Sequence, residues 1–111
     1  MNKIKPLLLS LTISIVGVSN TLYADGIDDL IAAMVRQAEQ TCSNYASNAM
    51  LQYQRSLQAD CRFPPSPRWQ ANYHNHYGWC YHTQHAKPEP LAAEQNAREA
   101  ELNACYNAKI R

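Results

Sequence analysis

Four cysteines constrain the fold of this chain more than any other feature of its sequence. They stand at Cys42, Cys61, Cys80 and Cys105, separated by nearly even intervals of 19, 19 and 25 residues. An even number of cysteines in a short chain is typical of disulfide-stapled domains that fold in an oxidising compartment. The chain has no C-x-x-C pair to begin a zinc site. We therefore expect two disulfides and no cofactor.

The N-terminal residues predict export. Lys3 and Lys5 precede an apolar run from Leu7 to Val18, and a polar stretch then leads to Ala24. This order is that of a secretory signal peptide, and the run of twelve residues is shorter than the roughly 20 that a membrane-spanning helix needs. We expect a signal peptide over residues 1–24, cleavage before Asp25, one mature domain over 25–111 with no stable membrane anchor, and a periplasmic or secreted location.

The composition of the mature chain limits its partners and its stability. Without Lys3 and Lys5 it has eight basic and nine acidic residues and no basic cluster. Nucleic acid and anionic membrane surfaces are therefore not expected partners. A chain of this size buries only roughly 60 % of its unfolded surface, so we expect disulfides to supply part of its stability.

Apolar spacing predicts one long first helix. From Ile27 to Leu57 the apolar residues recur at intervals of three and four, as on one face of an amphipathic helix. The prolines of segment 63–67 cannot continue a helix, because proline lacks the amide donor and restricts the residue before it. We expect this helix to end near Asp60.

Two further helices are predicted after the proline segment. Ser66 and Pro67 resemble a helix N-cap followed by a proline in the first turn, so we expect a second helix from about Pro67 to His82. Pro90 opens a third helix, over Leu91 to Ile110, with one stripe of small side chains at Ala93, Ala97, Ala100, Ala104 and Ala108. We expect the aromatic side chains of the second helix to fill the space against this alanine stripe.

Helix geometry narrows the cysteine pairing to two sets. Cys42 and Cys61 would lie roughly 28 Å apart on one helix, whereas bridged Cα atoms lie within about 7 Å. A three-helix bundle pairs Cys42 with Cys80 and Cys61 with Cys105. A two-helix hairpin with an ordered aromatic and histidine-rich loop pairs Cys42 with Cys105 and Cys61 with Cys80. We favour an all-α, disulfide-stapled three-helix bundle with a long first helix.

The cysteines and their neighbours resemble an uncharacterised family of small bacterial exported modules. The resemblance covers Cys42 to Cys105, and it departs from the pattern at Arg62, where a glycine is expected after the second cysteine. It implies a helical four-cysteine module and no known activity. The matching pieces are C-x2-YA-x2-A-x2-Q from Cys42, then Cys61, Arg68-Trp69, H-x2-WC from His76, and E-x3-R-x3-L-x2-C from Glu94.

Segment 69–85 offers a candidate ligand site. Trp79 and Tyr81 are positioned to stack on a sugar ring if they are exposed, because Trp69, Tyr73 and Tyr77 would share the other side of the second helix. His82 and His85 have the i, i+3 spacing of a metal-ligand pair, although no carboxylate stands close in the sequence to support them. This segment supports the alternative function, glycan or metal binding.

The start of the first helix provides the favoured functional surface. The bundle begins at Cys42, so the preceding residues would extend beyond it with one face too apolar for a solvated helix. That face consists of Ile27, Leu30, Ile31, Met34 and Val35. No nucleophile motif or phosphate-binding loop is present, so we do not expect an enzyme. We expect an exported helical module that acts through protein–protein contacts, either by self-association through this helix or by docking to a protein partner.

Overall fold

The computed structural model describes residues 4–110, with side chains described from Asp25 onward. The elements are α1 (Ile4–Gln58), α2 (Tyr73–Gly78), the π-helical turn η1 (Trp79–Thr83) and α3 (Pro88–Ile110). Over the described range the chain contains no strand. The predicted all-α fold with three helices and a long first helix is therefore confirmed. The side chains of the predicted signal peptide lie outside the described residues.

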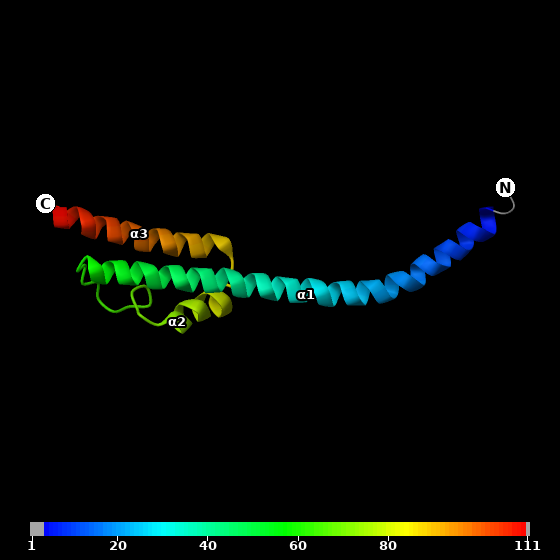
Figure 1. The fold of residues 1–111 in the computed structure, drawn as a ribbon, viewed down its shortest axis with the longest axis horizontal. Helices are drawn as coiled ribbons and strands as arrows, with labels where there is room; N and C mark the ends of the chain where they lie inside the picture. The colour runs from blue at the N-terminus through cyan, green and yellow to red at the C-terminus, as the bar shows by residue number, and fades with distance from the viewer. Residues whose placement is uncertain (1–3, 111) are drawn as a thin grey trace. The chain divides into compact units, whose positions relative to one another are not determined.

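The chain forms two compact units. The first, Met1–Arg36, includes the earlier part of α1, and the second, Gln37–Arg111, contains the rest of α1, α2, η1 and α3. In the second unit, α1 runs between α3 on one side and α2 with its preceding loop on the other (Figure 1). We call this second unit the stapled unit, because both disulfides lie in it.

The disulfides join both ends of the stapled unit. Cys42 of α1 is bonded to Cys80 of η1, and Cys61 is bonded to Cys105 of α3, with Cα separations of 5.5 and 5.7 Å. This is the favoured pairing of the three-helix bundle, so the nested pairing of the hairpin alternative is ruled out. The first disulfide holds the middle segment to α1, and the second holds the last part of α3 to the turn that follows α1.

Helix α1 ends in a Schellman motif. The Cys61 amide donates to the Ser56 carbonyl at 2.9 Å, and the Asp60 amide donates to the Leu57 carbonyl at 3.0 Å. Asp60 has a φ of 51° at the position where this motif usually has glycine. The helix thus ends at Gln58, close to the predicted Asp60, and its last carbonyls are satisfied by the turn itself.

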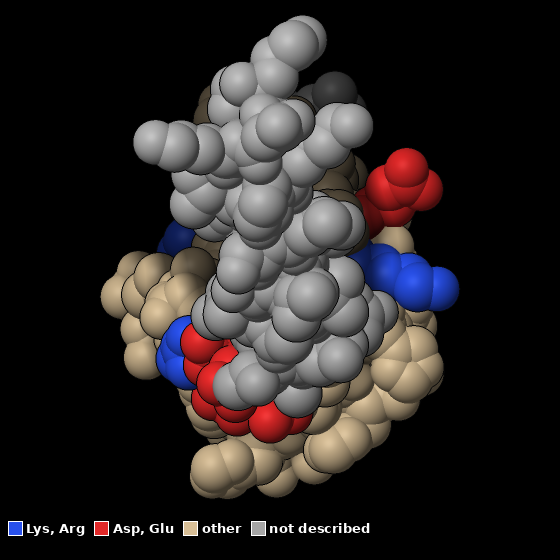
Figure 2. All heavy atoms as spheres, turned by 90° about the vertical axis from the view of Figure 1, so that its right-hand side faces the viewer, with Lys and Arg blue, Asp and Glu red and all other residues tan. Residues whose placement is uncertain are grey.

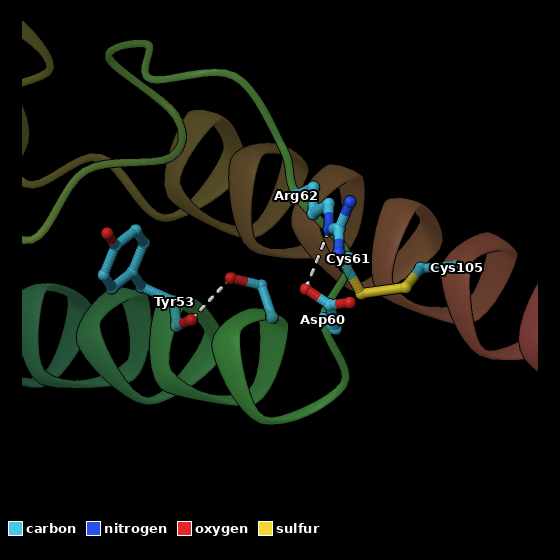
Figure 3. Close-up of a disulfide and its surroundings, with 6 residues drawn as sticks. Tyr53, Asp60, Cys61, Arg62 and Cys105 are labelled. Atoms are coloured by element: carbon cyan, nitrogen blue, oxygen red, sulfur yellow. Dashed lines mark hydrogen bonds and ion pairs between the residues drawn. A yellow bond between two sulfur atoms is a disulfide. The ribbon is translucent and has the colours of Figure 1, made fainter.

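The residue after the second cysteine also has a left-handed backbone. Arg62 has a φ of 57°, a conformation that glycine adopts without steric cost. Its guanidinium Nε lies 3.0 Å from a carboxylate oxygen of Asp60, on the exposed side of the turn next to the disulfide (Figure 3). The glycine expected at this position in the resembled pattern therefore has a conformational reason here.

The predicted start of the second helix is wrong by six residues. The Ser66 hydroxyl does accept a hydrogen bond from the Trp69 amide at 3.1 Å, as an N-cap would. The Ser66 amide, however, donates to the Trp69 carbonyl, which closes a turn instead of a helix. Helix α2 begins at Tyr73, where the side chain of Asn72 caps it by accepting from the Asn75 amide. Tertiary contacts of residues 68 and 69, described below, override the local helix signal.

The predicted alanine core of the third helix is also wrong. Ala93, Ala100, Ala104 and Ala108 are exposed and Ala97 is only half-buried, whereas Leu91, Arg98 and Leu102 face inward. The physical reason is hydrogen bonding, because residues of α1 and of the loop before α2 provide polar partners for Arg98 and for the carboxylates beside it. The core of the stapled unit is consequently small and partly polar.

Among the described residues, no helix has an apolar stretch long enough to cross a membrane. On the face in Figure 2, the acidic and basic side chains of the described residues lie in small groups, and neither sign forms a broad patch there.

Candidate functional site

A cleft of about 490 Å³ opens in the stapled unit. The loop before α2, helices α2 and α3, Tyr45 of α1 and Trp79 of η1 form its walls. Three aromatic side chains line it, namely Tyr45, Trp69 and Trp79, and the rings of Tyr45 and Trp79 lie 5.4 Å apart. Charged side chains from the loop and from α3 line the rest of the cleft. The cleft therefore combines aromatic surface with charge, as small-molecule sites commonly do.

Arg68 forms the ion-paired rim of the cleft. Its Nε and Nη2 donate to the two carboxylate oxygens of Glu94 at 2.6 and 3.2 Å, and its Nη1 donates to Glu101 at 3.0 Å. The indole of Trp69 donates to the same Glu101 oxygen at 3.2 Å, and its ring stacks on Phe63 at 4.3 Å. These contacts hold residues 68 and 69 against α3, and they explain why the predicted helix does not start here.

Arg98 lies deeper in the cleft and is only 1 % exposed. Its Nε donates to the Gln52 side chain at 2.7 Å, and its guanidinium carbon lies 5.0 Å from the centre of the Tyr45 ring. Its Nη1 is 3.8 Å from Glu94, too far for a hydrogen bond. Its Nη2 is buried and has no partner among the described residues. Arg98 is thus a buried cation with incomplete pairing.

Gln52 connects the cleft to a second ion pair, which joins Arg55 of α1 to Glu99 of α3. Its amide nitrogen donates to the Gln95 carbonyl at 3.1 Å and to Glu99 at 3.0 Å. Arg55 donates to both oxygens of Glu99, at 2.9 and 2.7 Å, and this bonding holds the pKa of the Glu99 carboxyl below its usual range. The network fixes the orientation of Gln52, which in turn orients Arg98.

His76 is a buried neutral group at the cleft. Its Nε2 lies 3.0 Å from the Gln70 carbonyl, and burial lowers its pKa from the ordinary value of 6.5. The contact with a carbonyl requires the proton on Nε2. The imidazole therefore adds no positive charge to the cleft at neutral pH.

The predicted glycan-stacking residues are separated by the fold. Trp79 is half-buried in the cleft against Tyr45, whereas Tyr81 belongs to a stack of three half-exposed tyrosines with Tyr73 and Tyr77. Adjacent rings in this stack lie 6.2 and 5.8 Å apart, and the Tyr73 hydroxyl donates to Ser43 of α1 at 3.0 Å. The prediction that Trp69 shares a helical face with Tyr73 and Tyr77 is wrong, because Trp69 precedes the helix.

The predicted metal pair is exposed and lacks further ligands. His82 and His85 are both solvent-exposed, and the His82 ring packs edge-on against Tyr81. Among the described residues, no group of three or more histidine, cysteine or carboxylate side chains is arranged to hold a metal ion. Metal binding by this pair stays a prediction.

The predicted contact surface on the first helix is exposed along its length. Leu30 and Met34 are 59 % and 60 % exposed, and the neighbouring members of the stripe are also exposed. Its five members are Ile27, Leu30, Ile31, Met34 and Val35. Helix α3 ends at Ile110, five residues after the cysteine bonded to Cys61, so its last residues lie at the Cys61 end of the stapled unit. We call these five residues the apolar stripe.

Sequence reasoning overlooked the charged part of the cleft. Arg98 follows Leu91 by seven residues and precedes Leu102 by four, so it occupies a core position of α3. A charged residue at an inward position was the available signal for a buried polar network.

No protein-family model matches the chain, and comparisons with curated proteins and with solved structures find no match either. The resemblance to exported four-cysteine modules therefore stays a prediction.

Proposed function

We propose that this chain is an exported, non-enzymatic helical module that acts through protein–protein contacts made by its apolar stripe. The observation that supports this proposal is the exposure of five large aliphatic side chains that lie along one stripe of the same helix. Burying such a side chain fully is worth roughly 1.5 to 3 kcal/mol. A solvated helix gains nothing from this pattern, whereas a contact helix gains affinity from each member.

The two disulfides favour a compartment outside the reducing cytoplasm. Residues 1–24 contain a charged, an apolar and a polar segment in the order of a signal peptide, which supports export. The periplasm or the extracellular medium is the location that fits both. Mass spectrometry of the recovered protein is expected to give a chain beginning at Asp25 with both disulfides intact. A full-length mass in the membrane fraction contradicts export by cleavage.

We infer that the occupant of the stripe is a second copy of the same helix. Ile27, Ile31, Met34 and Ala38 have the alternating spacing of four and three that helices use to pair with one another. Cys42 follows Ala38 by a second interval of four, and the alternation resumes from there at the buried residues Tyr45, Ala49 and Gln52. A helix with matching apolar spacing is therefore the complementary partner.

Light scattering of the oxidised protein over a concentration series tests this inference. The wild type is expected to approach twice the monomer mass, and a Leu30→Glu, Met34→Glu double variant is expected to stay monomeric. A Leu51→Glu, Leu57→Glu variant is the matched control, because these leucines are equally exposed on α1 but lie within the stapled unit. Its mass should follow the wild type. A wild type that is monomeric at all concentrations, or a control that dissociates equally, overturns the proposal.

A further inference from the structure

We propose that the cleft of the stapled unit binds a small carboxylate that carries a ring, with Arg98 as its anchor. The site lies wholly within the stapled unit, so this inference is independent of the apolar stripe. The cleft volume of about 490 Å³ falls in the range of roughly 300 to 1,000 Å³ that is usual for small-molecule sites.

The hydrogen bonds of the cleft leave one charged group with donors to spare. All three nitrogens of Arg68 donate to Glu94 or Glu101, and the Trp69 indole also donates to Glu101. Arg98 uses its Nε for Gln52, its Nη2 is buried without a partner among the described residues, and its Nη1 lies 3.8 Å from Glu94. A ligand that binds here is therefore expected to bring acceptors.

The charge balance favours an anionic acceptor over a neutral one. The nearest carboxylate to Arg98 is Glu94 at 3.8 Å, and Arg68 already binds both oxygens of that carboxylate. A buried cation is costly unless it is paired and hydrogen-bonded. Two oxygens of one carboxylate match the two Nη donors of a guanidinium as a bidentate pair. His76 is neutral and supplies no competing charge.

The aromatic walls define the rest of the ligand. The Tyr45 and Trp79 rings are tilted by 33° at 5.4 Å and line the cleft together with Trp69. Aromatic side chains favour contact with a flat ring or another apolar face. A ring attached to the carboxylate would thus contact these walls while the carboxylate reaches Arg98.

Binding of benzoate, with benzamide as its neutral isostere, tests the proposal. The chain has two tryptophans, and both line the cleft, so the two indole signals in a proton–nitrogen NMR spectrum report on the site. Benzoate is expected to shift both indole signals and the Arg98 Nε signal saturably. Benzamide is expected to bind about tenfold more weakly, because it lacks the charge-assisted pair. Equal affinity of the two probes, or no shift up to the solubility limit of benzoate, overturns the proposal.

Arginine-to-lysine substitutions at two positions test whether Arg98 binds the carboxylate. Arg98→Lys keeps the positive charge but loses the planar guanidinium that can donate to both carboxylate oxygens, so benzoate affinity should fall about tenfold. Arg62→Lys makes the same change at an exposed arginine outside the cleft, and it should leave benzoate affinity unchanged. Helicity by circular dichroism shows whether each variant is folded. If Arg98→Lys does not fold, Trp79→Leu replaces it and should weaken benzoate and benzamide to the same extent. Wild-type affinity in a folded Arg98→Lys protein overturns the assignment.

Discussion

The two parts of helix α1 place opposite kinds of side chain at the same helical spacing. In the stapled unit the buried positions of α1 are small or polar apart from the aromatic Tyr45, as Ala46, Ala49, Gln52 and Ser56 illustrate. In the segment before it the exposed positions are large and aliphatic, as Leu30 and Met34 illustrate. The buried part of the helix thus contributes no large aliphatic side chain, and the exposed part offers several.

This difference indicates how each region is stabilised. The stapled unit buries few large aliphatic side chains, so disulfides and a hydrogen-bonded network supply stability that an apolar core supplies elsewhere. The apolar stripe belongs to the other unit, and its side chains are exposed. Each experiment below alters one side of this comparison.

Reduction of the two disulfides is expected to have the largest effect. Loss of one such bridge costs about 2 to 5 kcal/mol, so loss of both should unfold the stapled unit. Circular dichroism of the protein with and without a reductant measures this. Non-reduced tryptic mapping should link the Cys42 peptide to the Cys80 peptide in the starting material. A reduced protein that keeps its helicity and melting temperature would show that the polar core suffices.

The same leucine-to-alanine change in the two regions compares them directly. Leu102 is fully buried in the stapled unit, whereas Leu30 is 59 % exposed. Leu102→Ala should lower the free energy of unfolding by about 2 to 5 kcal/mol, and Leu30→Ala should change it by less than about 0.5 kcal/mol. Chemical denaturation at low protein concentration tests both. Similar losses in the two variants would mean that the stripe is buried within the monomer.

Removing a partner of the buried arginine should have a moderate effect. Gln52→Leu removes the acceptor of the Arg98 Nε, which costs about 1 to 3 kcal/mol. Gln54→Leu is the matched control, since Gln54 is exposed on the same helix, and it should be nearly neutral. Urea denaturation of the two variants separates the outcomes. Equal stability would show that the network does not contribute to the folded state.

A glycine after the second cysteine should stabilise the turn slightly. Arg62 has a φ of 57°, which costs an L-residue about 1 kcal/mol, and Arg62→Gly removes that cost. The exposed ion pair with Asp60 that it loses is worth little. Thermal unfolding should show a higher midpoint for Arg62→Gly and no gain for Arg62→Ala, which keeps the Cβ atom. A gain in both variants would rule out backbone strain as the cause.

The smallest expected effect is a pH dependence from His76. Burial lowers its pKa below the ordinary value of 6.5, so the unfolded chain binds the proton more readily. The contribution of this group is complete above about pH 6.5 and is lost as the pH falls below it. His76→Gln should remove this slope in the free energy of unfolding, and His74→Gln, at an exposed site, should keep it. A slope that persists in His76→Gln must come from other groups.

The first helix and the cysteines were predictable because their signals are local or geometric. Three- and four-residue spacing marks the amphipathic face of α1, and the length of that helix alone excludes a bridge between Cys42 and Cys61. The end near Asp60 follows from the prolines that come after it. The exposure of the apolar stripe also agrees with the lengths, because these residues precede Cys42, where the predicted bundle begins.

Only the tertiary structure decided the inward face of α3 and the position of the middle segment. The alanines of α3 and its charged residues both recur at helical spacing, so periodicity cannot tell which stripe is buried. The choice depends on partners distant in sequence, namely Gln52 for Arg98 and Arg68 for Glu94 and Glu101. Likewise, Ser66 caps a turn because Trp69 and Arg68 bind α3. Hydrogen bonds between residues that are far apart in the chain leave no local trace in the sequence, and the cleft is built from such bonds.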